Sequence, residues 1–334
     1  DAMPSVKTHD LDLPRIGYIH AWQRTQDEGW VRAALDTYGV PYTYMSDQKL
    51  RAGNLRARFD VIIYPHVGGN LQSMVNGIAK TGKAPLPYRK TPATPNLAVL
   101  DQSEDIRGGM GIEGLVELSK FVQAGGTLIT EGSTATIFPG YGLTTGVTVE
   151  NSEDLFARGS IMRGRITDKA SPIVYGYEGD QLPVYFNQDP VLAVATGGGG
   201  GFGGGATSTI AGVGQNTTPM ATRPQISAWD TAGARRNRPA RDTASTPPPT
   251  SAELAIRPRV VMQFPADTSQ MLLSGTLAGA RVLANKAQVV DAPVGDGHVV
   301  MFAIRPMWRW QTQGTFMLVF NTIMNWNDLA AGRK

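Results

Sequence analysis

Two histidines and two carboxylates occupy positions from which they could act together as acids and bases. Each histidine lies at or just after a short apolar run that predicts a buried strand, and the carboxylates lie near a third such run and a predicted helix. The carboxyl ends of parallel strands meet at one edge of a sheet, where α/β folds bind ligands, so we expect these side chains to converge there. The candidate site consists of His20, His66, Asp27 and Glu131. The simpler interpretation of the histidines is that they are polar residues at strand ends.

Two glycine-rich stretches approach nucleotide-binding motifs without completing either. The stretch 77–84 nearly matches a P-loop, but Ala84 stands where a Ser or Thr must hold magnesium. Pro85 and Pro87 also exclude the helix that should follow. The stretch 109–114 fits a dinucleotide fingerprint and opens a predicted helix, whose amides could face a phosphate, but no buried strand precedes it. We interpret the first stretch as a basic loop and the second as a flexible start to a helix.

Several reaction classes are excluded by residues that the sequence lacks. The chain contains no cysteine, which excludes disulfides, thiolate metal sites and cysteine nucleophiles. It has neither a His-Glu-x-x-His zinc motif nor a Gly-x-Ser-x-Gly elbow. We therefore predict that the protein is not an enzyme and has no catalytic residues, metal or cofactor. No apolar run approaches the ~18 residues of a membrane span, so we expect no transmembrane segment of its own.

An aromatic and basic cluster lies near the C-terminal end of the sequence, where Trp308 and Trp310 alternate with Arg305 and Arg309. Such a cluster could stack a base or a sugar, or anchor a protein partner. The alternative is internal packing of arginine against tryptophan between a strand and the last helix. We include both tryptophans among the candidate partner-binding residues.

Strands and helices that alternate along the first 140 residues must position the candidate site. Strands are expected at 15–20, 40–44, 59–65 and 127–130, with helices at 28–38 and 112–124. Shorter extended pieces follow at 160–166, 191–195, 257–264, 287–291 and 298–304, and an amphipathic helix ends the pattern at 316–326. This alternation predicts an α/β fold with a parallel sheet covered on both faces.

The segment 196–252 interrupts the pattern with a composition rich in glycine, proline and arginine, which is typical of disorder. We interpret it as an insertion or arm within one domain made of 1–195 and 253–326, followed by a C-terminal tail at 327–334. Its five arginines and two aspartates give 5 − 2 = +3, which equals the formal net charge of the whole chain. The charges of the remaining residues sum to zero, and this argues against nucleic-acid binding. The candidate partner-binding residues of the arm are Phe202, Ile226, Trp229, Arg235, Arg236, Arg238 and Arg241.

Several stretches carry a resemblance to a known family, namely 14–17, 27–30, 38–42, 60–63, 108–114, 121–129 and, most specifically, 295–300, 305–306 and 311–316. In these stretches the chain resembles the amidotransferase-like domain that follows the catalytic domain in some bacterial zinc carboxypeptidase proteins. The resemblance implies a flavodoxin-like three-layer sheet of the class I glutamine amidotransferase type, with added short strands, and secretion across the inner membrane. It does not imply peptidase activity, because the zinc-binding His-x-x-Glu belongs to a domain that this chain lacks. An amidotransferase would place its cysteine near 131–133, where the sequence has none.

These observations favour a non-catalytic structural or interaction protein. It would be an accessory subunit that binds a larger extracytoplasmic or membrane-attached complex through the 196–252 arm. Its partners would be other protein subunits, such as those of an electron-transfer or photosynthetic membrane complex. The expected location is periplasmic or extracytoplasmic in a bacterium. One alternative is a hydrolase or small-ligand-binding module that uses the carboxyl edge of the sheet. Another is a released fragment of a carboxypeptidase-like precursor.

Overall fold

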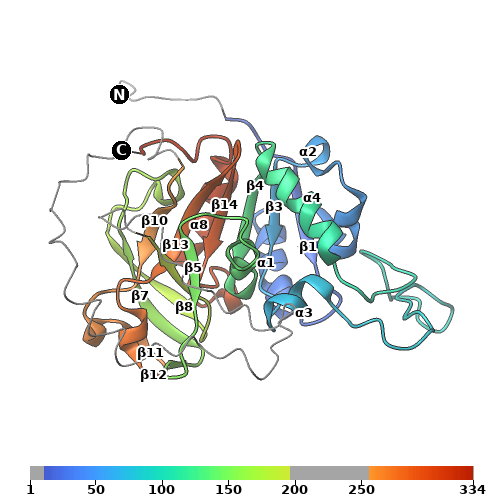
Figure 1. Ribbon diagram of the computed structural model, residues 1–334, viewed down its shortest axis with the longest axis horizontal. Helices are drawn as coiled ribbons and strands as arrows, with labels where there is room; N and C mark the ends of the chain where they lie inside the picture. The colour runs from blue at the N-terminus through green and yellow to red at the C-terminus, as the bar shows by residue number, and fades with distance from the viewer. Residues whose placement is uncertain (1–10, 196–255, 334) are drawn as a thin grey trace, which may run out of the picture. The chain divides into compact units, whose positions relative to one another are not determined.

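The structure, a computed structural model, describes residues 11–195 and 256–333 and is built on a twelve-stranded sheet (Figure 1). Five neighbouring strands are parallel and stand in the order β2-β1-β3-β4-β14. Their bounds are β1 Ile16–His20, β2 Thr43–Ser46, β3 Val61–Tyr64, β4 Thr127–Glu131 and β14 Gly297–Phe302. An order of 2-1-3-4-5 along a parallel sheet is that of flavodoxin-like folds. The α/β, flavodoxin-like prediction is confirmed.

Helices cover both faces of this parallel part, and the strands alternate their side chains between the two layers. Ile62 packs into one core cluster with the apolar side chains of α2, α3 and α4, whereas its neighbours Val61 and Ile63 pack into the other with α1 and α8. A strand that is buried on both faces reads as a continuous apolar run, which is why the sequence predicts β3 so clearly. The α-helices are α1 Gln26–Thr37, α2 Leu55–Arg58, α3 Leu71–Asn76, α4 Gly111–Gln123, α5 Ile137–Gly140 and α8 Phe316–Met324.

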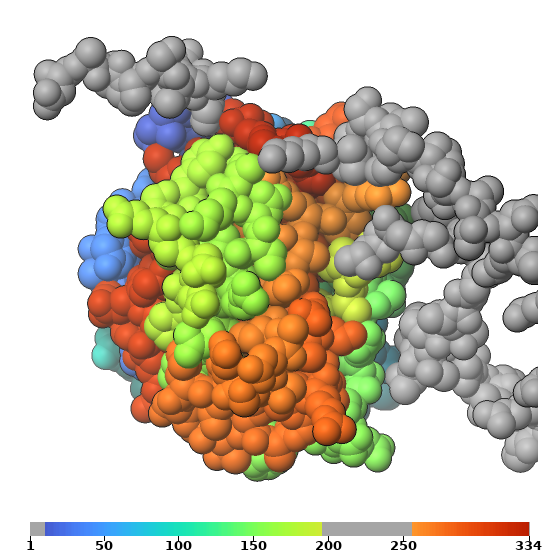
Figure 2. All heavy atoms as spheres, turned by 90° about the vertical axis from the view of Figure 1, so that its left-hand side faces the viewer, coloured from blue at the N-terminus to red at the C-terminus, as the bar shows by residue number. Residues whose placement is uncertain are grey.

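The remaining strands extend the sheet in antiparallel fashion from β14 (Figure 1). They are β5 Val147–Glu150, β7 Ser160–Ile166, β8 Gln181–Phe186, β9 Val191–Val194, β10 Arg259–Gln263, β11 Leu272–Ser274 and β13 Ala287–Val294; β6 Phe156–Ala157 and β12 Leu277–Ala278 form a separate pair. Figure 2 shows segments 150–195 and 256–290, in yellow-green and orange, side by side on this flank. Both β9 and β10 pair with β13, so the strands on the two sides of the 196–252 segment share one sheet, as predicted.

Short 3-10 helices occupy many of the connections. They are η1 Asp47–Ala52, η2 Gly132–Thr136, η3 Pro172–Val174, η4 Thr268–Gln270, η5 Ala280–Leu283, η6 Trp308–Trp310 and η7 Gln313–Thr315. A long connection, 77–110, joins α3 to α4 and is held together by isolated backbone bridges, among them Ile78 with Arg107 and Tyr88 with Ser103. Because no helix follows the stretch 77–84, the P-loop interpretation is ruled out and the basic-loop interpretation is confirmed.

The two glycine-rich stretches meet each other at the base of this connection. A Cβ atom on Gly77 would lie 2.8 Å from the Cα atom of Gly109, and a Cβ atom on Gly109 would overlap the carbonyl oxygen of Val75. Gly109 also has a positive φ of 48°. These glycines therefore serve a close crossing of two backbone segments, for which a residue without a Cβ atom is required.

Candidate functional site

Each of the five parallel strands delivers an ionisable side chain to the carboxyl edge of the sheet. β1 and β4 end in such a residue, whereas after β2, β3 and β14 it stands one to three positions beyond the strand. In the order of the sheet these residues are Asp47, His20, His66, Glu131 and Arg305. Parallel strands place their carboxyl ends at one edge, so residues far apart in the sequence meet there.

Glu131 and His66 are held together by the backbone that follows β4. The backbone N–H of His66 donates to Oε1 of Glu131 at 3.4 Å, and the N–H of Ser133 donates to Nδ1 of His66 at 2.9 Å. A nitrogen that accepts a hydrogen bond carries no proton in neutral imidazole, so the proton of His66 resides on Nε2. Gly132, between Glu131 and Ser133, has a φ of 53°, and a Cβ atom there would lie 2.5 Å from Nδ1 of His66. This tight turn therefore leaves no room for a side chain at 132.

Burial shifts the pKa values of the acids and bases in this cluster in ways that leave several of them uncharged. Burial, assisted by the nearby carboxylate of Asp27, raises the pKa of Glu131 to about 8. Burial also raises the pKa of Asp27 to about 6, although the charge of Arg305 opposes the shift. Burial, together with the positive charges of Arg305 and Arg24, lowers the pKa of His66 to about 3. At neutral pH the cluster holds a protonated Glu131, an ionised Asp27 and an uncharged His66.

Arg305 is the buried cation of the cluster, and its donors exceed the acceptors around it. Its side chain is 8% exposed, and one terminal nitrogen lies 3.4 Å from Oδ2 of Asp27. Its Nε atom is buried without a hydrogen-bond partner, although a guanidinium can donate five hydrogen bonds. The Cζ atom of the guanidinium lies over the ring of Trp308, 5.5 Å from its centroid. This contact holds the cation in place, while its Nε atom remains without an acceptor.

Arg24 adds a second positive charge next to His66. Its backbone has a φ of 57°, which is uncommon for a residue other than glycine, and its side chain lies beside Gly68 and Gly69. The described part of the chain offers Arg24 neither a hydrogen bond nor an ion pair. Residues in such sparsely populated backbone conformations cluster at functional sites.

His20 belongs to a separate group of contacts. Its Nε2 atom lies 2.9 Å from Oδ2 of Asp101, and its ring stacks on Tyr44 with centroids 4.4 Å apart. Asp101 also accepts a hydrogen bond from Nζ of Lys49 at 2.5 Å. Burial alone would raise the pKa of Asp101, but the hydrogen bonds from Lys49 and His20 outweigh it and hold that pKa below its ordinary value. The structure thus brings Asp27, His66 and Glu131 together, whereas His20 pairs with Asp101.

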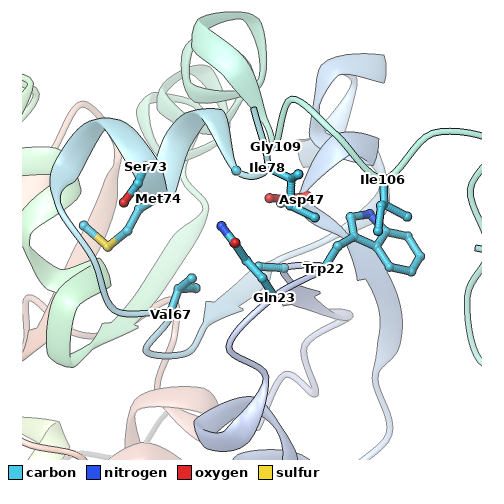
Figure 3. A pocket seen from close by; sticks show the side chains of 11 residues that line it. Trp22, Gln23, Asp47, Val67, Ser73, Met74, Ile78, Ile106 and Gly109 are labelled. Carbon is cyan, nitrogen blue, oxygen red and sulfur yellow. The ribbon is translucent and has the colours of Figure 1, made fainter. Parts of the chain in front are cut away.

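A narrow hollow lies between the carboxyl ends of β1 and β3 (Figure 3). It is too tight for a sphere the size of water. In a sheet of this strand order, the β1/β3 position is the topological switch point, where ligands bind in folds of this class. Asp47 lies on one side of the hollow, opposite Val67 and Met74, and the amide of Gln23 points into it (Figure 3).

Of the predicted partner-binding residues, the structure describes Trp308 and Trp310 but not those of the 196–252 arm. Trp308 is half-buried and packs on Tyr185 at 5.6 Å between ring centroids, whereas Trp310 contacts Phe316 and Tyr38. The internal packing considered for the aromatic cluster is therefore present. Seven of the predicted partner-binding residues lie outside the described residues, namely Phe202, Ile226, Trp229, Arg235, Arg236, Arg238 and Arg241. Within 11–195 and 256–333, no group of three or more His, Asp or Glu residues is arranged to hold a metal ion.

Comparisons with solved structures give proteins of similar fold at low sequence identity. Scans of known protein families and of curated proteins give no match. Among solved structures, a candidate ThuA-like protein from Parabacteroides merdae is 8% identical, with 97% of this chain and 93% of that chain covered and a TM-score of 0.47. A candidate component of GMP synthase from Thermoplasma acidophilum is 8% identical, with coverages of 95% and 94% and a TM-score of 0.44. A cytoplasmic protein from Salmonella typhimurium is 13% identical, with coverages of 92% and 97% and a TM-score of 0.42.

These comparisons bear on two of the sequence predictions. The ThuA-like and GMP synthase structures resemble this chain in fold, and the strand order of the parallel sheet makes that fold flavodoxin-like independently of them. None of the three proteins is a carboxypeptidase, and that part of the resemblance stays a prediction. The periplasmic or extracytoplasmic location is contradicted, because the Salmonella protein is described as cytoplasmic, and we withdraw that expectation.

The length and apolar character of the described helices bear on whether they could span a membrane. Within 11–195 and 256–333, none is long and apolar enough to cross a membrane.

Proposed function

We propose that this protein binds a small anionic molecule, such as a carboxylate or a phosphate monoanion, at the carboxyl edge of its sheet. The observation that carries the proposal is the buried guanidinium of Arg305, whose Nε atom has no partner and whose one carboxylate contact, to Asp27, is long at 3.4 Å. A buried donor that remains unpaired costs about 1–3 kcal/mol, and more when it is charged. A ligand oxygen that accepts from Nε would remove this cost.

The groups around Arg305 are also suited to an anion because most of them donate hydrogen bonds. With Nδ1 occupied by the N–H of Ser133, His66 presents Nε2–H. Glu131, whose pKa is raised to about 8, carries a proton at neutral pH. Arg24 supplies a positive charge that no described residue neutralises. Charge-assisted hydrogen bonds to carboxylate or phosphate are about twice as strong as neutral ones, and arginine is well suited to form them.

The same cluster can move a proton to or from the bound molecule. Near pH 7, Asp27 is mostly ionised while Glu131 is mostly protonated, so one carboxyl group can accept a proton and the other can donate one. Two carboxyl groups whose environments separate their pKa values form the usual acid–base pair of an active site. Proton transfer of this kind is the reaction step that we propose if the bound molecule is a substrate.

Titration calorimetry with acetate and with inorganic phosphate tests the proposal. At constant ionic strength, we expect one of these anions to bind the full chain and Arg305→Met to weaken the affinity at least tenfold. Arg24→Gln, at an exposed position, should weaken it severalfold without loss of fold. The exposed neighbour provides the control, Arg309→Met, which should bind as the original protein does. Absence of binding by both anions, or equal affinities in all four proteins, would contradict the proposal.

The sequence supports a second candidate function, in which the 196–252 arm holds another protein subunit. The segment carries the whole net charge of +3, and the two strands that flank it in the chain, β9 and β10, share a sheet with β13. Its arginines suit an acidic protein surface, and a component of an electron-transfer or photosynthetic membrane complex is one partner of that kind. This function requires no catalysis, in keeping with the prediction that the protein is not an enzyme. The origin as a carboxypeptidase-like fragment also stays a prediction.

A deletion separates this candidate from the first. Removal of residues 197–250 should leave a folded domain with unchanged anion affinity, because the two flanking strands pair with β13 independently of the segment. Co-purification of partner subunits should be lost in the deleted protein. Full retention of partners would show that the arm is not the binding element.

A further inference from the structure

The connection 77–110 exposes three aliphatic side chains that the core does not use. Val99 is 77% exposed, its neighbour Leu100 is 60% exposed, and Leu86 is 48% exposed. Figure 1 shows this connection, in teal, projecting from the body beside α3 and α4. Single apolar residues on a surface are common, but several of them on one projecting segment indicate an interaction surface.

Backbone hydrogen bonds hold the two halves of this connection together. Tyr88 and Ser103 exchange N–H···O bonds of 2.8 and 3.0 Å. Beyond this bridge, the outgoing half of the connection continues to Lys90, and the returning half arrives from Leu100. The exposed aliphatic residues of both halves therefore belong to one lobe, which consists of residues 80–100.

The backbone around Leu86 has few polar groups that need water. Its neighbours Pro85 and Pro87 carry no N–H group. The N–H of Leu86 donates to Oδ1 of Asp105 at 3.2 Å, and its carbonyl oxygen accepts from the N–H of Ile106 at 2.9 Å. Unpaired backbone groups make it costly to bring a loop into contact with hydrocarbon, because hydrocarbon offers them no partner. At Leu86 this cost is reduced.

The unpaired charges of the connection are all positive. Each of its three acidic residues is paired with a cation, namely Asp101 with Lys49, Glu104 with Arg89 and Asp105 with Arg107. Lys80, Lys83 and Lys90 are exposed, and the described residues offer them neither a hydrogen bond nor an ion pair. The basic loop 77–84 therefore adds free positive charge to the same lobe as the exposed aliphatic residues.

We propose that the 80–100 lobe docks on the surface of an anionic lipid bilayer, with Leu86, Val99 and Leu100 entering the interface. Lysines are attracted to an anionic membrane surface, and their aliphatic stems can lie along it while the ammonium groups stay in water. A protein partner fits this lobe less well. Leucine and valine are under-represented among the residues that dominate protein interfaces, and lysine is depleted there. The proposal does not rest on the anion site.

Co-sedimentation of the full chain with lipid vesicles tests the proposal. Vesicles of phosphatidylcholine with about one third phosphatidylserine should bind the protein at least tenfold more tightly than phosphatidylcholine alone, and high salt should weaken the binding. Because the chain has no cysteine, Val99→Cys provides a single attachment site for an environment-sensitive fluorophore. Its emission should shift to the blue on binding. The same label at Leu273→Cys, an exposed position in β11, should not respond.

Substitutions in the lobe have matched controls elsewhere on the surface. Vesicle binding should weaken at least tenfold when serine replaces all three aliphatic residues, in the variant Leu86→Ser, Val99→Ser and Leu100→Ser. The exposed leucines of β11 provide the control, Leu272→Ser with Leu273→Ser, which should bind as the original protein does. Lys83→Gln should weaken binding about fivefold, whereas Lys169→Gln, at an exposed position outside the lobe, should not.

Three results would overturn the proposal. The first is absence of binding to the anionic vesicles. The second is an unchanged emission of the label at position 99 in the vesicle-bound protein, which would mean that another basic segment, such as the 196–252 arm, holds the vesicles. The third is an equal loss of binding in the lobe variants and their controls. Recovery of a protein that only the lobe variants fail to bind, without any binding to vesicles, would assign the lobe to a protein partner instead.

Discussion

At the scale of single residues, burial rather than residue type decides the charges in the candidate site. Asp27 and Glu131 are both carboxylic acids, but full burial next to a second carboxylate raises the pKa of Glu131 further than partial burial raises that of Asp27. The difference gives two similar side chains opposite roles at neutral pH. The same surroundings keep His66 uncharged, since burial and the positive charges of two arginines all lower its pKa.

The raised pKa of Glu131 predicts that the protein loses stability as the pH rises. Between the ordinary pKa of 4.5 and about 8, the unfolded chain releases this proton while the folded chain retains it. The folded state therefore binds more protons, and the free energy of unfolding falls with increasing pH across this window. One unit of pKa difference corresponds to about 1.4 kcal/mol, so the loss should reach a few kcal/mol by pH 8.

Urea denaturation at pH 5 and pH 8 measures this loss. Glu131→Gln removes the ionisable group and should reduce the pH dependence, so that at pH 8 the variant is the more stable protein. Glu153→Gln, at an exposed position, is the control and should follow the original protein at both pH values. A pH dependence that Glu131→Gln leaves unchanged would show that Glu131 does not hold its proton in the folded state.

The sequence allowed part of this cluster to be predicted, for a physical reason. Glu131 and His66 lie at or near strand ends, and strand ends are visible as the end of an apolar run. Arg305 stands three residues beyond β14 and was assigned to the aromatic cluster instead, because its distance from Asp27 depends on strand order. Asp47 follows β2, whose end the sequence placed two residues too early.

At the scale of elements, the strand β2 shows why boundaries are harder to predict than elements. The apolar residues 40–44 predicted the strand, whereas it spans Thr43–Ser46. Val40 is used by the preceding helix, because its N–H donates to the carbonyl oxygen of Leu35 at 2.9 Å after the left-handed turn at Gly39. A backbone donor committed to a helix end cannot also join a sheet ladder. The helix cap therefore delays the strand.

Two glycine-to-alanine substitutions should change the free energy of unfolding in opposite directions. Gly109→Ala should lower the free energy of unfolding by about 2 kcal/mol or more, because it combines a positive φ with overlap onto the backbone of Val75 and Gly77. Gly29→Ala should raise it by about 0.5–1 kcal/mol, since Gly29 lies within α1 and a Cβ atom there meets nothing within 4 Å. Thermal and urea denaturation of the two variants measure both effects.

The pair also separates two interpretations of the glycine-rich stretch 109–114. If Gly109 serves the backbone crossing, Gly109→Ala should lose stability as stated, whereas a glycine that only provides a flexible start to the helix should tolerate alanine. If Gly109→Ala folds with unchanged stability, the close crossing with Gly77 is wrong. The sequence could not distinguish these interpretations, because the contact joins positions 32 residues apart.

At the scale of the whole described chain, the C-terminal residues pack against the antiparallel strands of the sheet. Leu329 is 1% exposed, and its carbonyl oxygen accepts a hydrogen bond from Arg259 of β10. Arg333 donates to Oδ2 of Asp291 in β13 at 2.6 Å and to the carbonyl oxygen of Arg257 at 2.7 Å. The segment thus ties two antiparallel strands together near the point where the described chain resumes after residue 255.

The pair of Arg333 and Asp291 predicts a large loss of stability when one partner is removed. Asp291 is fully buried, and without Arg333 its remaining side-chain partner is Nδ1 of His298 at 2.6 Å. Removal of one partner from a buried ion pair costs about 3–5 kcal/mol, and because the contact with His298 remains, Arg333→Met should lower the free energy of unfolding by up to about that amount. The exposed Arg281→Met should stay within about 0.5 kcal/mol of the original protein, and urea denaturation compares the two.

The double variant Asp291→Asn with Arg333→Met isolates the interaction itself. Because Asn carries no charge, removal of Arg333 no longer leaves a buried carboxylate without its cationic partner. The double variant should therefore lose less stability than the sum of the two single losses. Simple addition of the losses would mean that the two side chains act independently. Stability of Arg333→Met equal to that of Arg281→Met would mean that the C-terminal segment does not hold β13, and that the strands on either side of the 196–252 segment are joined by their backbone pairing alone.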